Sequence, residues 1–174
     1  MQLILVMECN SIAKTDYMYI KAFLDHFYPD RTVKLSPIFL GGKAKYDKVE
    51  KKIEEQKKKY HAGHNQKEKT NVCFFLDTDF GKDGDRLNSI IEKFCKEKQY
   101  YLVWFHRDVE EVFLQRQVSS EEKVKCSKAF LRKPSFNEKD LKKRVKIDFT
   151  NPPFGISNIK KVMDEIYGKL EKQE

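Results

Sequence analysis

The chain has 174 residues, of which 40% are hydrophobic and 13% aromatic, which is enough apolar material for one folded domain with a buried core. Its four cysteines are widely spaced and include no Cys-x-x-Cys pair, which argues against a zinc knuckle and against a disulfide-stapled secreted protein. The formal net charge is +8. No apolar run approaches the roughly 18 residues that a helix needs to cross a membrane, and the amino-terminal apolar run lacks the features of a signal peptide. We therefore expect a cytoplasmic protein that does not enter the membrane.

The first elements in the chain alternate between strand and helix. Residues 2–7 form a continuous apolar run, typical of a strand that is buried on both faces. Residues 15–28 have apolar side chains at helical spacing, which predicts an amphipathic helix that ends before Pro29. Residues 32–40 predict a second strand, and because Pro37 lies within it we expect an edge or bulged position in the sheet. The inward face of the helix is expected to hold Tyr17, Ile20, Leu24 and Phe27.

The middle of the chain continues this alternation. A Gly-Gly turn leads into a lysine-rich helix expected from about residue 44 to 60, and residues 71–76 predict a third strand. A helix follows over about 85–97, and residues 99–105 predict a fourth strand, in which Tyr100 and Tyr101 serve packing. The inward residues of the helix at 85–97 are expected to be Leu87, Ile90, Ile91 and Phe94. His61 and His64 fall in a polar stretch between the lysine-rich helix and the third strand, so we expect solvated loop histidines.

The rest of the chain is predicted to be mainly helical. Asp108 is well placed to cap a helix that begins after the fourth strand, and residues 119–133 and 157–172 predict two more helices. Alternating strands and helices predict an α/β fold, a Rossmann-like and mainly parallel sheet with helices on both faces. We divide the chain into a catalytic core at 1–118 and a helical extension at 119–174 that packs on the core within the same domain.

Carboxylates follow two of the predicted strands at the point where each ends. Asp77 and Asp79 come after the third strand, and Glu8 comes after the first. Ligand sites in parallel sheets lie at the carboxyl ends of the strands. Neighbouring strands are ~4.8 Å apart and Mg²⁺–oxygen distances are ~2.1 Å. If the first and third strands are adjacent, the three carboxylates are therefore able to share one Mg²⁺ ion. One residue of separation places Asp77 and Asp79 on the same side of an extended backbone. The alternative is an ordinary polar turn, which we favour for Asp83 and Asp85 as caps of the next helix.

This arrangement resembles the Toprim domain of topoisomerases, primases and OLD-family nucleases, which has a glutamate after the first strand and Asp-x-Asp after the third. Within that family the chain is most similar to the RloB-like branch. The segment KTDYMYIKAF at 14–23 corresponds to a Lys-Thr-Glu…Tyr segment, LGGKAKYDKVEKKI at 40–53 to a glycine after the second strand, and DVEEVFL at 108–114 to an apolar-Glu element. The resemblance covers about residues 3–115. It departs from the family pattern in having Glu8-Cys9 where Glu-Gly is usual.

The resemblance implies a Toprim-like fold and a nuclease that hydrolyses phosphodiester bonds of DNA or RNA with Mg²⁺, or Mn²⁺ in its place. Asp77 and Asp79 would bind the metal, and Glu8 would be a ligand or a general base. The later family glutamate corresponds to Glu110, which fits the register better than Glu111 and would complete a second metal site.

The same resemblance implies a role in bacterial anti-phage defence, with nucleic acid as the substrate and an activating protein partner in a defence complex. Residues 71–110 are net acidic, whereas 41–70 and 111–174 are net basic, a distribution that suits a polyanionic substrate brought to a metal. The candidate phosphate-backbone contacts are Lys43, Lys45 and Lys82, and the alternative for each is ordinary surface charge.

Two other functions remain open from the sequence. The first is a non-catalytic nucleic-acid or partner-binding module with a degenerate site, which the Glu8-Cys9 departure favours. The second is a haloacid-dehalogenase-like phosphatase, because an apolar strand followed by Asp77-Thr78-Asp79 also resembles that family's nucleophile motif. Against the second, the motif lies far from the start of the chain and no late acidic pair follows another strand.

Overall fold

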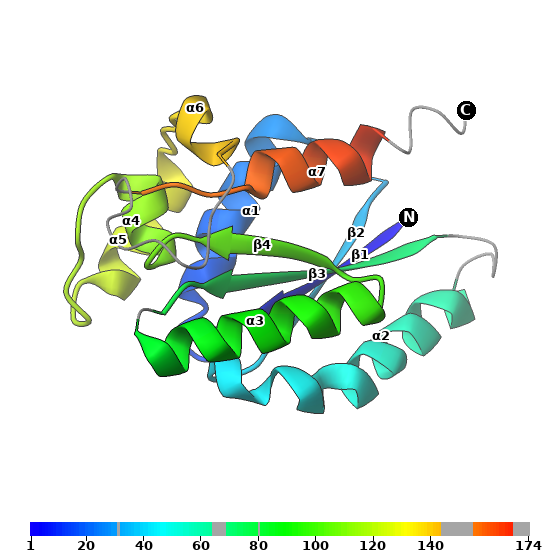
Figure 1. Cartoon of the computed structure of the whole chain (residues 1–174). Helices are drawn as coiled ribbons and strands as arrows, with labels where there is room; N and C mark the ends of the chain where they lie inside the picture. Colours follow the sequence, from blue (N-terminus) through cyan, green and yellow to red (C-terminus); the bar gives the residue numbers. More distant parts are fainter. Residues whose placement is uncertain (31, 64–68, 80, 144–154, 169–174) are drawn as a thin grey trace.

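The computed structural model describes residues 1–30, 32–63, 69–79, 81–143 and 155–168. Four parallel strands form one sheet in the order β2-β1-β3-β4 (Figure 1). The strands are β1 (Gln2–Met7), β2 (Lys34–Phe39), β3 (Thr70–Asp77) and β4 (Tyr101–Phe105). The α/β class and the parallel sheet are confirmed.

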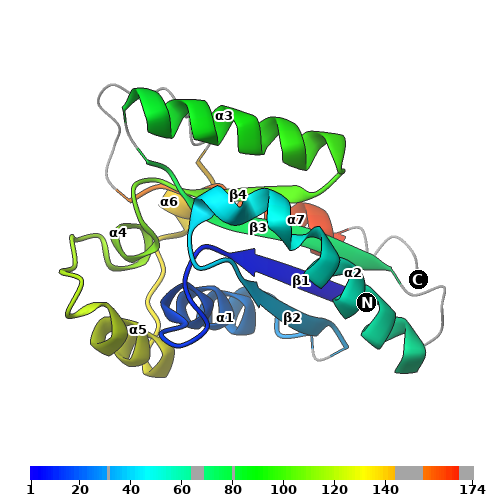
Figure 2. The same ribbon diagram turned by 90° about the horizontal axis from the view of Figure 1, so that it is seen from below.

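Helices cover both faces of this sheet (Figures 1 and 2). They are α1 (Thr15–Phe27), the 3-10 helix η1 (Lys43–Val49), α2 (Glu50–Gly63), α3 (Lys82–Glu97), α4 (Val109–Leu114), α5 (Lys123–Arg132), α6 (Glu138–Leu141) and α7 (Ile159–Gly168). Side chains of η1, α2 and α3 pack on one face, and side chains of α1, α4, α5, α6 and α7 pack on the other. None of the described helices is long and apolar enough to span a membrane.

The central strand β1 contributes to both hydrophobic layers. Leu3, Leu5 and Met7 belong to the layer under α1, whereas Ile4 and Val6 belong to the layer under α2 and α3. This alternation follows from the period-two geometry of a strand, and it explains why the β1 sequence is continuously apolar. Because β1 lies between β2 and β3, its end is surrounded by the ends of its neighbours.

The second strand is at the edge of the sheet, as its proline predicts. Lys34 donates its backbone N–H to Met1 and Leu40 donates to Met7, so the even-numbered positions of this strand face β1. Pro37 is odd-numbered, and the N–H that it lacks would therefore point away from the sheet. The proline costs the ladder no hydrogen bond.

Several helix details differ from the sequence predictions. The lysine-rich helix begins with a turn of 3-10 helix, and α1 centres its inward face on Tyr19 and Phe23, which are fully buried. Ile90 is 43% exposed, because the buried face of α3 runs through Asn88, Ile91 and Cys95 instead. A polar side chain takes an inward position there, which a pattern of apolar residues alone does not reveal.

The carboxyl-terminal helices join the core under α1. Phe130 of α5, Leu141 of α6 and Ile159 of α7 belong to the same hydrophobic layer as α1. Short α6 was not expected from the sequence, and the predicted turn at 150–155 lies almost entirely outside the described residues.

The segment just before α7 closes the outer edge of β4. Ser157 forms an antiparallel bridge with Phe105, and its hydroxyl donates to the Trp104 carbonyl at 2.9 Å. The Asn158 side chain accepts from the Trp104 N–H at 2.8 Å and donates to the Leu102 carbonyl at 3.1 Å. One asparagine therefore satisfies two backbone groups that an edge strand would otherwise leave unpaired.

Replacing this asparagine is expected to destabilise the fold. Asn158→Ala leaves the N–H of buried Trp104 without its partner, and we expect the free energy of unfolding to fall by about 1–3 kcal/mol, measured by chemical denaturation. Lys161→Ala, on the exposed side of α7, is the matched control and should change it by less than about 0.5 kcal/mol. Equal stability of the two variants would contradict this role of Asn158.

Candidate functional site

Acidic residues converge where β1, β3 and β4 end. Glu8 directly follows β1, and Asp77 is the last residue of β3. These strands are adjacent, and the pairing of Met7 with Phe75 places Glu8 one position short of the level of Asp77. Helix α4, which begins just after β4, carries Glu110 to the same edge of the sheet.

A glycine turn after β2 brings a lysine into this acidic edge. Gly41 and Gly42 have φ angles of 65° and 123°, values that favour glycine over residues with a side chain. Their N–H groups donate to the carbonyls of Cys9 and Glu8, at 3.3 and 3.0 Å, so the turn is bonded to the residues that follow β1. The next residue, Lys43, is only 3% exposed.

Lys43 joins the strand ends to α3. Its ammonium donates to the Asp77 carbonyl at 2.7 Å and to Oδ1 of Asn88 at 2.9 Å, and it lies 2.7 Å from Oδ2 of Asp79. It also lies 5.8 Å from the centre of the Trp104 ring. The sequence suggested that Lys43 contacts a phosphate backbone, but here its charge is used inside the protein.

Asp79 lies in the loop between β3 and α3, and its backbone packs closely against the first turn of α3. A Cβ placed on Gly84 would lie 2.7 Å from the Asp79 carbonyl oxygen, so a larger residue at this position would push the helix away. Asn88 donates its side-chain amide to the same carbonyl at 3.2 Å while accepting from Lys43. Gly84, in the first turn of α3, is thus required by a close approach to Asp79.

Thr78, between the two aspartates, connects β3 to the end of β4. Its N–H donates to the Phe105 carbonyl at 2.9 Å, and its hydroxyl accepts from the Arg107 N–H at 3.0 Å. The hydroxyl also lies 3.4 Å from Nδ1 of His106, a buried ring whose pKa burial lowers to about 4. His106 is therefore neutral at physiological pH and adds no charge to this edge.

Glu8 is the carboxylate that connects the parts of the site electrostatically. Burial raises its pKa, the charge of Lys43 lowers it, and the charges of Asp79 and Asp16 raise it again. Its Oε2 is buried and accepts no hydrogen bond from the described residues. A buried carboxylate oxygen without a donor is costly unless a cation neutralises it.

Asp77 is in an equally unfavourable environment. Burial raises its pKa well above the usual range, and the negative charges of Asp16, Glu8, Asp108 and Glu110 raise it further. Carboxylates this close cannot all be ionised without a counter-charge. A divalent cation is one species that would supply it.

Asp16, at the start of α1, is a site residue that sequence reasoning did not single out. Its Oδ2 accepts from the Cys9 N–H at 2.9 Å and its Oδ1 accepts from the Thr15 hydroxyl at 3.0 Å. It is 8% exposed, and burial raises its pKa. The only sequence signal for it was its place in the KTDY segment at 14–17.

A second lysine neutralises Glu110. The Lys123 ammonium lies 2.9 Å from Oε2 of Glu110 and 3.5 Å from Oδ2 of Asp108, while Oε1 of Glu110 is buried without a hydrogen-bond donor among the described residues. Asp108 caps α4 as predicted, accepting from the Glu111 N–H at 2.8 Å. Glu111 is directed to Arg107, at 3.6 Å, which leaves Glu110 as the better-placed glutamate for this site.

The predicted ligands do not form an assembled metal site in this structure. Within the described ranges, no three His, Cys, Asp or Glu side chains are arranged so that they could hold one ion. The charge of Asp77 interacts with Asp16, Glu8 and Glu110, whereas Asp79 pairs with Lys43. The expectation that Asp77 and Asp79 share a side assumed a continuing strand, but β3 ends at Asp77.

The other predicted residues lie at the periphery. Lys45 and Lys82 are exposed, and the Lys45 ammonium donates to the Gly41 carbonyl at 2.9 Å. Asp83 and Asp85 are in the first turn of α3, where acidic residues stabilise a helix, but the cap position is Gly81 and has no side-chain cap. The prediction of two loop histidines is wrong for His61, which is in α2, while His64 lies outside the described residues.

Comparison with known proteins gives no match to a family model, a curated protein or a solved structure. Function therefore has to be inferred from the chemistry of the site itself.

Removing the Lys43 ammonium is expected to destabilise the site. Lys43→Met leaves the Asp77 carbonyl, Asn88 and Asp79 without their shared donor, and because Asp79 is 58% exposed we expect a loss of only about 1–3 kcal/mol in the free energy of unfolding. Chemical denaturation measures the change. The control Lys45→Met, with the same substitution at an exposed site, should have almost no effect, and comparable losses in both variants would rule out this role of Lys43.

Neutralising Asp77 is expected to stabilise the metal-free protein. Because folding raises the pKa of Asp77, the wild-type carboxyl makes folding less favourable above the ordinary pKa of an aspartate, so Asp77→Asn should raise the free energy of unfolding by roughly 0.5–2 kcal/mol at pH 7 in EDTA. The difference should shrink as the pH falls below the folded-state pKa towards the ordinary pKa, where the unfolded chain is protonated as well. An Asn variant less stable than the wild type at pH 7 would refute the repulsion, and Asp83→Asn at the exposed helix turn is the control.

Proposed function

We propose that this protein is a Mg²⁺-dependent nuclease of the Toprim type that hydrolyses phosphodiester bonds of DNA or RNA. The observation that carries the proposal is the meeting of Glu8 and Asp77 at the ends of two adjacent parallel strands, with Oε2 of Glu8 buried and without a donor among the described residues. A site shared by Glu8 and Asp77 requires β1 and β3 to be adjacent, as they are in the strand order β2-β1-β3-β4.

The donor set fits a hard divalent cation. Oxygen ligands are what Mg²⁺ and Mn²⁺ prefer, and Glu8, Asp77 and Asp79 would hold the ion, with Glu110 available to a second one. Asp79 is 58% exposed and forms an ion pair with Lys43, so on binding the metal ion it would give up this ion pair. Glu110 would likewise release Lys123. In the structure, the ammonium groups of Lys43 and Lys123 provide the positive charge that neutralises Asp79 and Glu110.

The residues of the chain then have distinct tasks. A bound divalent ion would polarise the scissile phosphate and stabilise the leaving oxygen. Glu8, whose pKa is raised by burial, would be either a ligand of the ion or the general base that accepts a proton from an attacking water. Lys43, released from Asp79, would remain bonded to the Asp77 carbonyl and Asn88 and would keep these two elements together.

A nucleic-acid substrate is supported by the distribution of charge. Lys45 follows the turn that delivers Lys43, and Lys82 begins α3 beside the acidic edge, so both exposed ammonium groups are near the strand ends. Lysines in such positions contact phosphates without regard to sequence. As part of the same proposal, the protein acts in the cytoplasm in anti-phage defence, together with an activating protein.

A second candidate is a non-catalytic module that binds nucleic acid. The ion pairs of Lys43 with Asp79 and of Lys123 with Glu110 favour it, because they neutralise two carboxylates without a metal. Such a module would bind nucleic acid in a salt-dependent manner whether or not a chelator is present.

The nuclease proposal is tested by cleavage assays on single- and double-stranded DNA and RNA with Mg²⁺ or Mn²⁺. We expect cleavage by the wild type, its loss in EDTA, and at least a roughly hundredfold decrease in rate for Asp77→Ala, the size of effect expected for a group essential to transition-state stabilisation. The matched control is Asp83→Ala, an exposed aspartate in the next helix, which should retain activity.

Other results separate the alternatives. Equal rates for Asp77→Ala and the wild type would end the proposal. Nucleic-acid binding that is unaffected by chelator, with no turnover on any substrate, would support the binding module instead. Hydrolysis of p-nitrophenyl phosphate without nuclease activity would support the phosphatase resemblance.

A further inference from the structure

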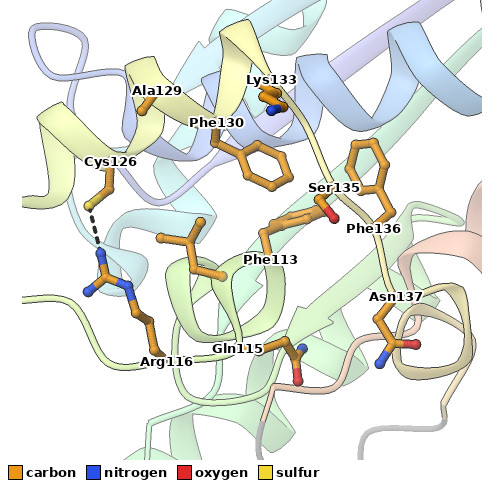
Figure 3. A pocket seen from close by; sticks show the side chains of 11 residues that line it. Phe113, Gln115, Arg116, Cys126, Ala129, Phe130, Lys133, Ser135, Phe136 and Asn137 are labelled. Carbon is orange, nitrogen blue, oxygen red and sulfur yellow. Dashed lines mark hydrogen bonds between the residues drawn. The ribbon is translucent and has the colours of Figure 1, made fainter.

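A cavity of about 480 Å³ opens beside the candidate site, between α4, α5 and the chain that follows α5 (Figure 3). Its volume is in the range of pockets that bind small molecules. It is lined by residues 113–116 on one side and by seven residues of α5 and the chain after it on the other: Cys126, Ala129, Phe130, Lys133, Ser135, Phe136 and Asn137. None of these residues was singled out in the sequence.

The interior of the cavity is aromatic. The rings of Phe113, Phe130 and Phe136 converge in Figure 3 in tilted and edge-to-face contacts, with centres 5.5 Å apart for Phe113 and Phe130 and 5.4 Å apart for Phe130 and Phe136. Phe113 and Phe130 are nearly buried, whereas Phe136 is half-buried and also packs against His26 and Phe27, with ring centres 4.9 and 5.1 Å apart. Such a wall offers aromatic edges and apolar surface to a planar ligand.

The rim of the cavity is cationic and polar. Arg116 and Lys133 are both exposed, and neither forms an ion pair with a carboxylate within the described part of the chain. The Arg116 guanidinium donates to the Cys126 sulfur at 3.4 Å and to the Gln117 carbonyl at 3.2 Å, acceptors that carry no full negative charge. Gln115 also lines the cavity, and its amide nitrogen donates to the carbonyls of Val112 and Gly155. An anionic group with hydrogen-bonding edges would complement this surface.

The cavity and the carboxylate site share the same two helices. On α4, Glu110 precedes Phe113 by three residues, and on α5, Lys123 precedes Cys126 by three residues. Three residues are less than one helical turn, a rise of about 4.5 Å. The ion pair of Glu110 with Lys123 is therefore one turn away from the cavity wall on both helices.

We propose that this cavity binds one nucleotide, with its base against the aromatic wall of Phe113, Phe130 and Phe136 and its phosphate at the cationic rim, where Arg116 and Lys133 lie on opposite sides. Apolar rings beside unpaired cations fit a planar aromatic ligand that carries a phosphate better than they fit a lipid or a neutral aromatic compound. The binding itself follows from the cavity. That the bound nucleotide neighbours the scissile phosphate rests on the proposed nuclease function.

The test is titration of the full chain with adenosine 5′-monophosphate in EDTA, followed by calorimetry or by NMR shifts. We expect binding that is weakened about tenfold by Arg116→Ala and by Lys133→Ala, since each removes one charge-assisted contact to the phosphate. Arg132→Ala, which removes the neighbouring exposed cation outside the cavity, should leave the affinity within about twofold. Adenosine without phosphate and inorganic phosphate alone should each bind more weakly than the nucleotide.

Two outcomes would overturn the proposal: no binding of the nucleotide, or binding that Arg132→Ala weakens as much as Arg116→Ala does. Both variants replace exposed side chains, and circular dichroism verifies that they fold. Failure of this proposal is distinguishable from failure of the nuclease proposal. Arg116-dependent nucleotide binding without Mg²⁺-dependent cleavage would leave the cavity assignment standing alone, and metal-dependent cleavage without nucleotide binding would leave only the nuclease.

Discussion

Repulsion among carboxylates at the carboxyl ends of β1 and β3 is the constraint around which the site is organised. Parallel pairing of the two strands places Glu8 and Asp77 close together, and Asp16 and Glu110 approach from two helices. The protein offsets this charge with Lys43 and with another lysine from α5. The two ammonium groups thus neutralise part of the acidic edge from within the protein, and under the proposed function a bound metal would replace them.

The two lysines come from different parts of the fold. Lys43 enters through the Gly-Gly turn after β2 and is bonded to α3, so it fixes the geometry of the loop that holds Asp79. Lys123 comes from α5, in the region predicted to be an extension of the core. Because this lysine contacts Glu110, the carboxyl-terminal helices contribute directly to the electrostatics of the site.

Sequence reasoning predicted the sheet and the residues at its edge because both follow from simple periodicities. A continuous apolar run such as residues 2–7 predicts a buried strand. A carboxylate that directly follows such a strand lies at the carboxyl end of the sheet. The lysine partners were not predictable in this way, since a lysine gives the same signal whether its ammonium is solvated or buried. Lys43 and Lys45 differ by two positions, yet only Lys43 is enclosed.

The orientation of Asp79 shows a second limit of the sequence. Alternation of side chains predicts that Asp77 and Asp79 face the same way, but it applies only as far as the strand continues. Gly84 and Asn88 of α3 contact the Asp79 backbone, and its carboxylate pairs with Lys43 from the turn after β2, a contact that no local pattern encodes. The cavity beside α4 is hidden for the same reason, because its walls come from segments that meet only in the folded protein.

The protected edges of the sheet have a consequence for how molecules of this protein meet one another. On the outer side of β2, Pro37 offers no N–H to an incoming strand, and on β4 the side chain of Asn158 already occupies the backbone groups. Neither edge is a good template for adding a strand from a second chain. Among the described residues, the outer strands of the sheet are therefore poor sites for self-association by strand addition.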